Sequence, residues 1–366
     1  MSTEAEISAM RRAIELAEGA LGVPNPNPAV GAVVLDRAGQ VVGTGATAPI
    51  GGPHAEVVAL TAAGERARGG TVVVTLEPCS HQGRTGPCSA AIMAAGISRV
   101  VFAVADPHGV AAGGAAQLRD AGIDVKSGVL ADDARHDLEP WLVATAEGRP
   151  YVTWKYAATL DGRTAAADGT SKWITGVGAR LDVQVVRSRS DAVVVGIGTV
   201  LADDPALTVR EVDVGRQPLR VVVDSDARTP LGAKVLDEVA PTLIAVAGDA
   251  PADRVAALRG TAAEVVELPR TSAGVDLGAL MGCLFEQERR LLVLEGGATL
   301  ATGFLRAGLV DRVIAYIAPA LLGAGSSVVG DFGVATIDRA VRLMPKDLTY
   351  LDGDVRIVAT VEKAEG

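Results

Sequence analysis

The sequence predicts an α/β protein with two domains. Valine-rich strand segments alternate with helical segments along the whole chain, and this alternation is typical of layered α/β folds. With 366 residues, the chain is longer than one ordinary hydrophobic core requires. The tripeptide Gly148-Arg149-Pro150 interrupts the pattern between two such series. We therefore expect one domain over 1–147 and a second over 150–366.

The first series opens with a helix, because apolar residues recur at helical spacing over 6–21. Prolines then hold 24–28 in a non-helical loop. The strands expected in this series are 30–35, 41–45, 71–76, 100–105 and 123–125. The further helices expected are 54–67, one that opens at Cys79 and continues through 89–95, 117–121, and 132–146 with a bend at Pro140.

The second series continues the alternation after the break. The strands expected there are 151–157, 191–196, 219–224, 242–247, 291–294 and 312–317. Helices are expected over 178–189 and 298–307. Residues 343–362 indicate a closing antiparallel pair that turns at Asp352-Gly353. Both domains are therefore expected to be layered α/β structures.

Composition excludes several classes of partner. The formal charge of -10 and the pI of about 5.0 argue against broad electrostatic binding to nucleic acid or to an anionic membrane. Residues 1–6 are polar and acidic, unlike a secretory signal, and the apolar runs are too short to span a bilayer. Two of the three cysteines belong to a metal-binding pattern, so we expect no disulfide and a cytoplasmic location.

The segment 54–88 carries the residues of a metal site. His54, Cys79 and Cys88 are the ligand types that Zn²⁺ takes when one position is kept for water. Glu56 follows the histidine by two positions, and H-x-E followed by P-C and a further Cys is the signature of zinc deaminases. We therefore predict a deaminase in which zinc lowers the pKa of water to about 7 and Glu56 carries its proton to the leaving ammonia.

Other interpretations of this segment stay open on the residues alone. A closed structural zinc site would need a fourth ligand, for which His81 is the nearby candidate, but it would leave Glu56 without a role. A non-catalytic, zinc-stabilised nucleotide-binding module would also leave Glu56 without a role. A deaminase of nucleic-acid bases would need a basic groove and stacking aromatic residues, whereas this chain is acidic and only 3% aromatic.

The spacing of the cysteines narrows the family. Cys79 and Cys88 are nine positions apart, whereas nucleoside deaminases use C-x-x-C. The segment TLEPCSHQGRTGPC at 75–88 closely resembles the bifunctional deaminase-reductase of riboflavin biosynthesis, and so do PNPNPAVG at 24–31 and HAEV at 54–57. Similar segments in the second half are KYAATLDGR at 155–163, SKWIT at 171–175, VVR at 185–187, GTVLADDPALTVR at 198–210, VDS at 223–225 and EGGATL at 295–300.

The resemblance implies a cytidine-deaminase-like N-terminal domain and a dihydrofolate-reductase-like C-terminal domain. The implied substrate is a small pyrimidine, a diaminopyrimidinone ribosylamine 5′-phosphate, whose 2-amino group is replaced by a carbonyl. The second domain would then use NADPH to reduce the ribosyl group to ribityl. The implied cofactors are therefore Zn²⁺ and NADPH. The family tends to associate through its reductase domains, so a homodimer or a larger homo-oligomer is expected.

The resemblance also implies roles for individual residues. His54, Cys79 and Cys88 would bind zinc, Glu56 would transfer protons, and Asn27 would line the pyrimidine pocket with His81 or Arg84. NADP contacts are implied at Ala157, Trp173, Thr199, Asp203, Ser225, Gly297, Ala298, Thr299, Leu300, Ala301, Thr302 and Gly303. Substrate contacts in the reductase domain are implied at Ser171, Arg187, Leu207, Arg210 and Glu295. The chain departs from the family pattern in HGVAAGG at 108–114.

Residue chemistry supports part of the reductase assignment. The segment 295–297 lies between an expected strand and an expected helix, where glycines allow close backbone approach and a helix N-terminus favours a phosphate. A plain strand-to-helix turn would look the same. Arg187 and Arg210 could share a substrate phosphate in an otherwise acidic protein, although most arginines are solvated surface charges.

Overall fold

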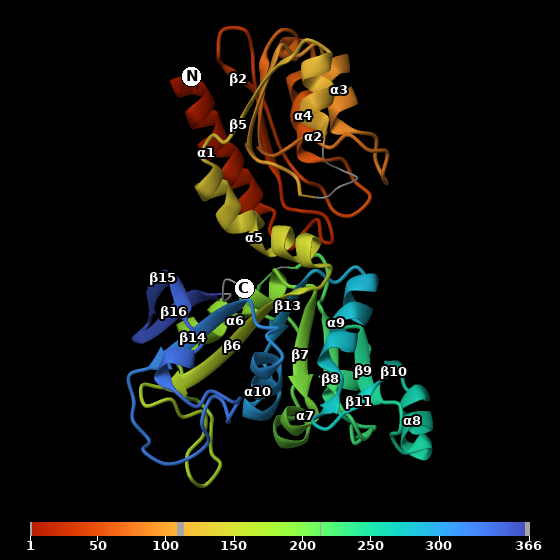
Figure 1. Ribbon diagram of the computed structural model, residues 1–366, viewed down its shortest axis with the longest axis vertical. Helices are drawn as coiled ribbons and strands as arrows, with labels where there is room; N and C mark the ends of the chain where they lie inside the picture. The colour runs from red at the N-terminus through yellow and green to blue at the C-terminus, as the bar shows by residue number, and fades with distance from the viewer. Residues whose placement is uncertain (1, 108–112, 213, 363–366) are drawn as a thin grey trace. The chain divides into compact units, whose positions relative to one another are not determined.

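The chain folds into two compact units. The computed structural model describes residues 2–107, 113–212 and 214–362 (Figure 1). The units are Met1–Gly148 and Arg149–Gly366, and each is built on its own β-sheet. No helix among the described residues is long and apolar enough to cross a membrane. The alternating pattern of the sequence therefore corresponds to two layered α/β units.

The first unit contains a five-stranded sheet in the order β2-β1-β3-β4-β5. Strand β1 is antiparallel to β2 and β3, whereas β3, β4 and β5 run parallel. The strands are β1 (Gly31–Leu35), β2 (Val41–Ala46), β3 (Thr71–Leu76), β4 (Arg99–Val104) and β5 (Asp124–Ser127). The helices are α1 (Glu4–Gly19), α2 (Ala55–Ala63) with a 3-10 turn at Gly64–Ala67, α3 (Cys88–Ala94), α4 (Gly114–Asp120) and α5 (Ala131–Glu147).

Two glycines of β2 set the position of α2 on this sheet. A Cβ at Gly43 would lie 2.2 Å from the carbonyl oxygen of Ala59, and a Cβ at Gly45 would lie 2.5 Å from that of Ala55. Any other residue would push the helix away, because contacts this short are sterically forbidden. The side chains of Ala55 and Ala59 are fully buried on the same side of the helix. The first turn of α2, which carries Glu56, is therefore held tightly against the sheet.

The second unit contains a nine-stranded sheet in the order β10-β9-β8-β7-β13-β6-β14-β16-β15. The strands from β10 to β14 in this order are parallel, and β16 and β15 add an antiparallel edge. The strands are β6 (Tyr151–Thr159), β7 (Ala192–Gly196), β8 (Leu219–Val223), β9 (Thr242–Ala247), β10 (Glu264–Leu268), β13 (Leu291–Leu294), β14 (Arg312–Ala318), β15 (Leu343–Leu351) and β16 (Asp354–Val361). A separate small ribbon consists of β11 (Arg270–Thr271) and β12 (Gly274–Val275).

Helices cover both faces of this second sheet. They are α6 (Val177–Ser188), α7 (Ile197–Asp203), α8 (Ala252–Arg259), α9 (Leu277–Glu286) and α10 (Ala298–Arg306), with 3-10 turns at Lys234–Leu236 and Ile337–Arg339. Successive residues of β7 point to opposite faces, so Val194 packs in one core with Leu280 of α9, and Val193 packs in another with Leu258 of α8. Runs of buried valine in the sequence reflect this burial on two sides.

The expected local structure was wrong at Cys79 and incomplete in the second unit. No helix opens at Cys79: α3 begins at Cys88, because Gly83, Gly86 and Pro87 break the intervening segment. Helix α7 was not predicted, because the glycines before it resemble a loop, and α8, α9 and the edge strand β10 were not predicted either. Pro140 lies inside α5, which continues from Ala131 to Glu147 without interruption.

Candidate active sites

Three elements of the first unit bring His54, Cys79 and Cys88 together. His54 caps the N-terminus of α2, Cys79 follows β3 and Cys88 opens α3. One ligand atom from each residue lies within 4.8 Å of the others. His54 Nδ1 is 3.2 Å from Cys88 Sγ and 3.6 Å from Cys79 Sγ. One imidazole nitrogen and two sulfurs that converge in this way fit a tetrahedral zinc ion with one position left for water.

Hydrogen bonds make Cys79 the more acidic of the two thiols. The Cys88 thiol and then His54 lower the pKa of Cys79 to about 4, and the Cys88 backbone N–H donates to Cys79 Sγ at 3.3 Å. The same thiol pairing and burial raise the pKa of Cys88. Metal ligands bind as thiolates, so a divalent cation bound here would displace the remaining thiol protons.

Glu56 lies beside this cluster without belonging to it. Its residue surface is only 4% exposed, and burial raises the pKa of its carboxyl group. A carboxyl group whose pKa is raised toward neutrality can accept and return a proton during a reaction. His81, the candidate fourth ligand, is not part of the cluster formed by the described residues. The donor set therefore leaves room for a catalytic water rather than closing the site.

In the second unit, four adjacent parallel strands end at one edge of the sheet. Gly196 ends β7, Ser225 lies just after β8, the segment 295–297 follows β13 and Thr159 ends β6. Ligands of open α/β sheets bind outside the carboxyl ends of the strands. Most residues expected to contact NADP or substrate follow one of these strand ends, so the topology gathers segments far apart in the sequence.

A buried carboxylate lies at the centre of this edge. Arg187 of α6 donates to Glu295 through Nε at 2.6 Å and Nη2 at 3.0 Å, and Lys155 Nζ of β6 lies 3.2 Å from the same carboxylate. Burial alone would raise the pKa of Glu295, but the charges of Arg187 and Lys155 hold it well below its usual range. Arg187 is therefore not a solvated surface charge; it is buried and also donates to the carbonyl of Thr208 at 3.0 Å.

Comparisons with known proteins agree with both halves. The RibD C-terminal domain model matches residues 150–357, and the cytidine and deoxycytidylate deaminase zinc-binding region matches residues 3–104. The chain is 46% identical over 338 residues to the riboflavin biosynthesis protein RibD of Mycobacterium tuberculosis, covering 91% of each chain. The identity to RibD of Aquifex aeolicus is 41%, covering 98% of this chain and 99% of the relative.

The chain belongs to the RibD family. The solved structure of Acinetobacter baumannii RibD superposes with a TM-score of 0.88 at 38% identity, covering 98% of this chain and 99% of that one. A Thermotoga maritima structure gives 0.85 at 33% identity with the same coverage. RibD proteins are bifunctional deaminase-reductases of riboflavin biosynthesis, and the chain combines a zinc-binding deaminase domain with a reductase domain that uses NADPH.

The predicted reductase residues of this RibD chain differ in their exposure. Leu207 and Ala301 are buried, and Ala301 packs in the hydrophobic core. Trp173 is 71% exposed and lies under the Arg180 guanidinium at 4.7 Å, while Asp203 lies 3.8 Å from Lys172. The remaining exposed members are Arg210, Gly297 and Thr299. The half-buried members are Ala157, Ser171, Thr199, Ser225, Ala298, Leu300, Thr302 and Gly303.

The proline-rich loop presents two asparagines of different burial. Asn27 is half-buried, and its backbone N–H donates to the carbonyl of Pro24 at 3.0 Å. Trp141 of α5 donates to the carbonyl of Pro26 at 3.1 Å, which ties the loop to the helix. Asn25 is buried, and its Nδ2 has no hydrogen-bond partner among the described residues. Sequence spacing singled out Asn27 and gave no signal for Asn25.

Glu77 is a second residue that the sequence analysis missed. Its carboxylate accepts the backbone N–H groups of Gly113 at 3.3 Å and Ala115 at 3.1 Å. Gly114 lies so close to the Cys79 segment that a Cβ there would be 1.8 Å from the carbonyl oxygen of Pro78. These contacts fix the start of α4 against the zinc ligands. The divergent segment noted in the sequence falls partly on 108–112, which lie outside the described residues.

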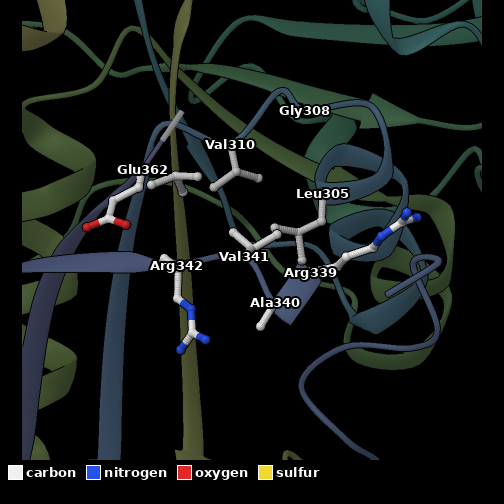
Figure 2. A pocket seen from close by; sticks show the side chains of 9 residues that line it. Leu305, Gly308, Val310, Arg339, Ala340, Val341, Arg342 and Glu362 are labelled. Carbon is white, nitrogen blue, oxygen red and sulfur yellow. The ribbon is translucent and has the colours of Figure 1, made fainter. Parts of the chain in front are cut away.

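The second unit also has a cavity of about 490 Å³ (Figure 2). Leu305 at the end of α10, Val310 and Val341 give it an apolar lining, and Arg339 and Arg342 add positive charge. None of the residues expected to bind NADP or substrate lines it. We therefore assign no part of the reductase reaction to this cavity.

Proposed function

We propose that this chain deaminates a diaminopyrimidinone ribosylamine 5′-phosphate and then reduces its ribosyl group to ribityl with NADPH. The proposal is carried by one observation: three side chains that can bind a metal ion lie beside the buried Glu56, in a chain that also contains the RibD reductase domain. The Thermotoga maritima relative is named diaminohydroxyphosphoribosylaminopyrimidine deaminase/5-amino-6-(5-phosphoribosylamino)uracil reductase. We assign the deaminase to 1–147 and the reductase to 150–366.

The deaminase step follows from the chemistry of the first unit. Bound zinc supplies a water of lowered pKa as the nucleophile. Glu56 would accept one proton of that water and deliver it to the ring nitrogen, and would then carry the hydroxyl proton of the adduct to the amine that leaves as ammonia, so that one water is consumed and one ammonia is released. Burial favours this role, because it raises the pKa of Glu56 above its ordinary value and so favours the protonated form. Asn27, with His81 or Arg84, would orient the pyrimidine.

The reductase step takes place at the carboxyl edge of the second sheet. Bound NADPH supplies a hydride to C1′ of the ribosyl group. We assign the cofactor to the segments that contain Ala157, Trp173, Thr199, Asp203, Ser225 and 297–303, and the substrate to those that contain Ser171, Leu207 and Arg210. Arg187 and Glu295 would line the same site, and the ion pair between them supports a positioning role for Arg187 rather than service as a free phosphate cation. Lys155, which the sequence analysis did not single out, would contribute the remaining positive charge.

We infer that the protein is a cytoplasmic homo-oligomer. The three cysteines are free, which suits a reducing compartment. Among the described residues, strand β15 lies at one edge of its sheet and carries exposed apolar side chains, such as Leu348 and Tyr350, the latter 77% exposed. Sedimentation analysis of the wild-type chain and of Tyr350→Lys tests this: a monomeric wild type would contradict the inference.

The central experiment measures both activities in one preparation. The full chain with zinc should release ammonia from the diaminopyrimidinone phosphate and then oxidise NADPH. Glu56→Gln should keep its zinc, lose ammonia release by about 10²–10⁴-fold, and still oxidise NADPH when it is given the deaminated substrate. Ammonia release at the wild-type rate from the zinc-loaded Glu56→Gln variant would overturn the assignment.

A further inference from the structure

The imidazole of His54 has a contact on each of its two nitrogens. Nδ1 faces the two sulfurs, at 3.2 Å from Cys88 and 3.6 Å from Cys79. On the opposite side of the ring, Nε2 lies 3.2 Å from the hydroxyl oxygen of Thr85. The orientation of the ring is therefore fixed by the cysteines on one side and by a single threonine on the other.

Thr85 reaches this position because of the long connection between the cysteines. The segment 80–87 turns at Gly83, whose backbone N–H donates to the carbonyl of Thr85 at 3.1 Å. Thr85 is half-buried and precedes Cys88 by three positions. A C-x-x-C connection has only two intervening residues, so it has no room for a residue that returns to the histidine. The inserted residues thus bring a hydroxyl group to the outer nitrogen of a ligand.

We propose that Thr85 is a positioning residue that holds His54 in the tautomer with its proton on Nε2. A neutral imidazole has one N–H donor and one acceptor nitrogen. If Nε2 donates to the Thr85 hydroxyl, the lone pair of Nδ1 points at the space between Cys79 and Cys88, as a metal ligand requires. The opposite tautomer would place a proton on Nδ1 and could not bind a metal there. This inference rests on the proposed zinc site and extends it to a residue outside the ligand set.

Side chains that hydrogen-bond a metal-ligating histidine have a measurable effect on metal affinity. Loss of a group that hydrogen-bonds the outer nitrogen of a ligating histidine typically weakens metal affinity by about 10–100-fold. The hydroxyl of Thr85 should therefore matter more than its methyl group. Replacement by serine keeps the hydroxyl, whereas replacement by valine keeps the shape and removes the acceptor.

The test measures zinc affinity by chelator competition on the full chain. We expect Thr85→Val to bind zinc about 10–100-fold more weakly than the wild type, and Thr85→Ser to remain within about threefold of it. In the cobalt-substituted protein, the d–d absorption bands should change in Thr85→Val and not in Thr85→Ser. Thr61→Val is the matched control, because that exposed hydroxyl of α2 donates only to the carbonyl of Val57.

Urea unfolding of the first unit in the metal-free chain reports on folding in the same samples. Each variant should unfold there at the wild-type urea concentration, and it should oxidise NADPH at the wild-type rate when it is given the deaminated substrate. If Thr85→Val does not meet this condition, Thr85→Ala takes its place with the same expected loss of zinc affinity. Wild-type affinity in the hydroxyl-free variant, or an equal loss in Thr85→Ser, would overturn the role of Thr85. Zinc retained by His54→Ala would instead overturn the proposed metal site itself.

Discussion

The two candidate sites differ in how their buried charges are balanced. In the first unit, His54, Cys79 and Cys88 offer three donors to one point, with the buried Glu56 beside them. In the second unit, Glu295 is already surrounded by two cations, Arg187 and Lys155. The first arrangement is completed by a cation from outside. The second carries one positive charge in excess, which suits an anionic ligand.

Because of this difference, we expect mutations to lower stability for different reasons in the two units. A ligand that binds only the folded first unit stabilises it by a free energy that grows with the logarithm of the ligand concentration divided by its Kd. The second cluster is held by the chain alone, so removal of one member leaves a buried charge without its partner. Zinc removal should therefore affect the first unit alone, whereas substitution at Glu295 should affect the second.

The largest effect is expected from removal of a zinc ligand. Cys88→Ser replaces a buried thiol at the start of α3, and it should weaken zinc binding by more than about 100-fold, beyond the cost of losing an outer-shell partner. Ammonia release should be lost while NADPH oxidation with the deaminated substrate continues. Metal analysis and the two rates measure this. Cys283→Ser in α9 is the matched control and should keep zinc and both activities. Zinc at full occupancy in Cys88→Ser would show that the cluster is not the metal site.

A smaller but still large effect is expected from Glu295→Gln. The change removes the carboxylate shared by the buried Arg187 and the half-buried Lys155, and breaking a buried ion pair from one side costs about 3–5 kcal/mol. Thermal or urea unfolding of the second unit measures the loss. Glu267→Gln is the control, because its ion pair with Arg259 is exposed and should contribute little. Equal stabilities of the two variants would contradict the importance of the buried cluster.

The same carboxylate predicts a pH dependence. The pKa of Glu295 is held below its ordinary value of 4.5 in the folded state, so the unfolded chain binds the proton more readily. Its contribution to stability is fully present above pH 4.5 and is lost as the pH falls through the lower folded-state pKa. Urea unfolding below pH 4.5 should therefore show a steeper decline for the wild type than for Glu295→Gln. Parallel curves would contradict this.

The sequence was sufficient to predict the zinc ligands, but it did not predict the contacts between distant residues that hold the functional side chains in place. His54, Glu56 and Cys79 follow from local patterns whose chemistry is specific, and the alternation of strands and helices predicts both sheets except for the edge strand β10. Contacts between distant residues leave no such local pattern. Arg187 and Glu295 are 108 positions apart, and nothing in the sequence shows that one neutralises the other.

The errors in secondary structure have a related cause. Helix α7 was missed because its N-terminal glycines have low intrinsic helix propensity, and packing of Ile197 and Val200 in the core overrides that preference. The helix expected at Cys79 begins at Cys88 instead, because the residues between them form the loop that carries Thr85 to His54. Tertiary contacts thus determine both the presence of α7 and the residue at which α3 begins.

A moderate effect is expected where glycine allows the chain to pass close to the zinc ligands. Gly114→Ala would place a Cβ 1.8 Å from the carbonyl oxygen of Pro78, so α4 and the Cys79 segment must move apart. Overpacking of this kind costs about 1–3 kcal/mol, and zinc affinity should fall with it. Unfolding of the first unit and chelator competition measure both. Gly19→Ala in α1 meets open space and should leave both unchanged. Unchanged zinc affinity in Gly114→Ala would mean that the contact does not position Cys79.

The smallest effect on stability is expected from Asp203→Asn at the end of α7. Its ion pair with Lys172 is long, at 3.8 Å, and both side chains are largely exposed, so stability should change by less than about 0.5 kcal/mol. If Asp203 contacts NADP, the KM for NADPH should nevertheless change several-fold while kcat stays the same, because the residue contributes to binding and not to hydride transfer. Glu267→Gln again provides the exposed control and should change neither. An unchanged KM would remove Asp203 from the cofactor site and leave the buried cluster around Glu295 as the better guide to where the reductase binds its ligands.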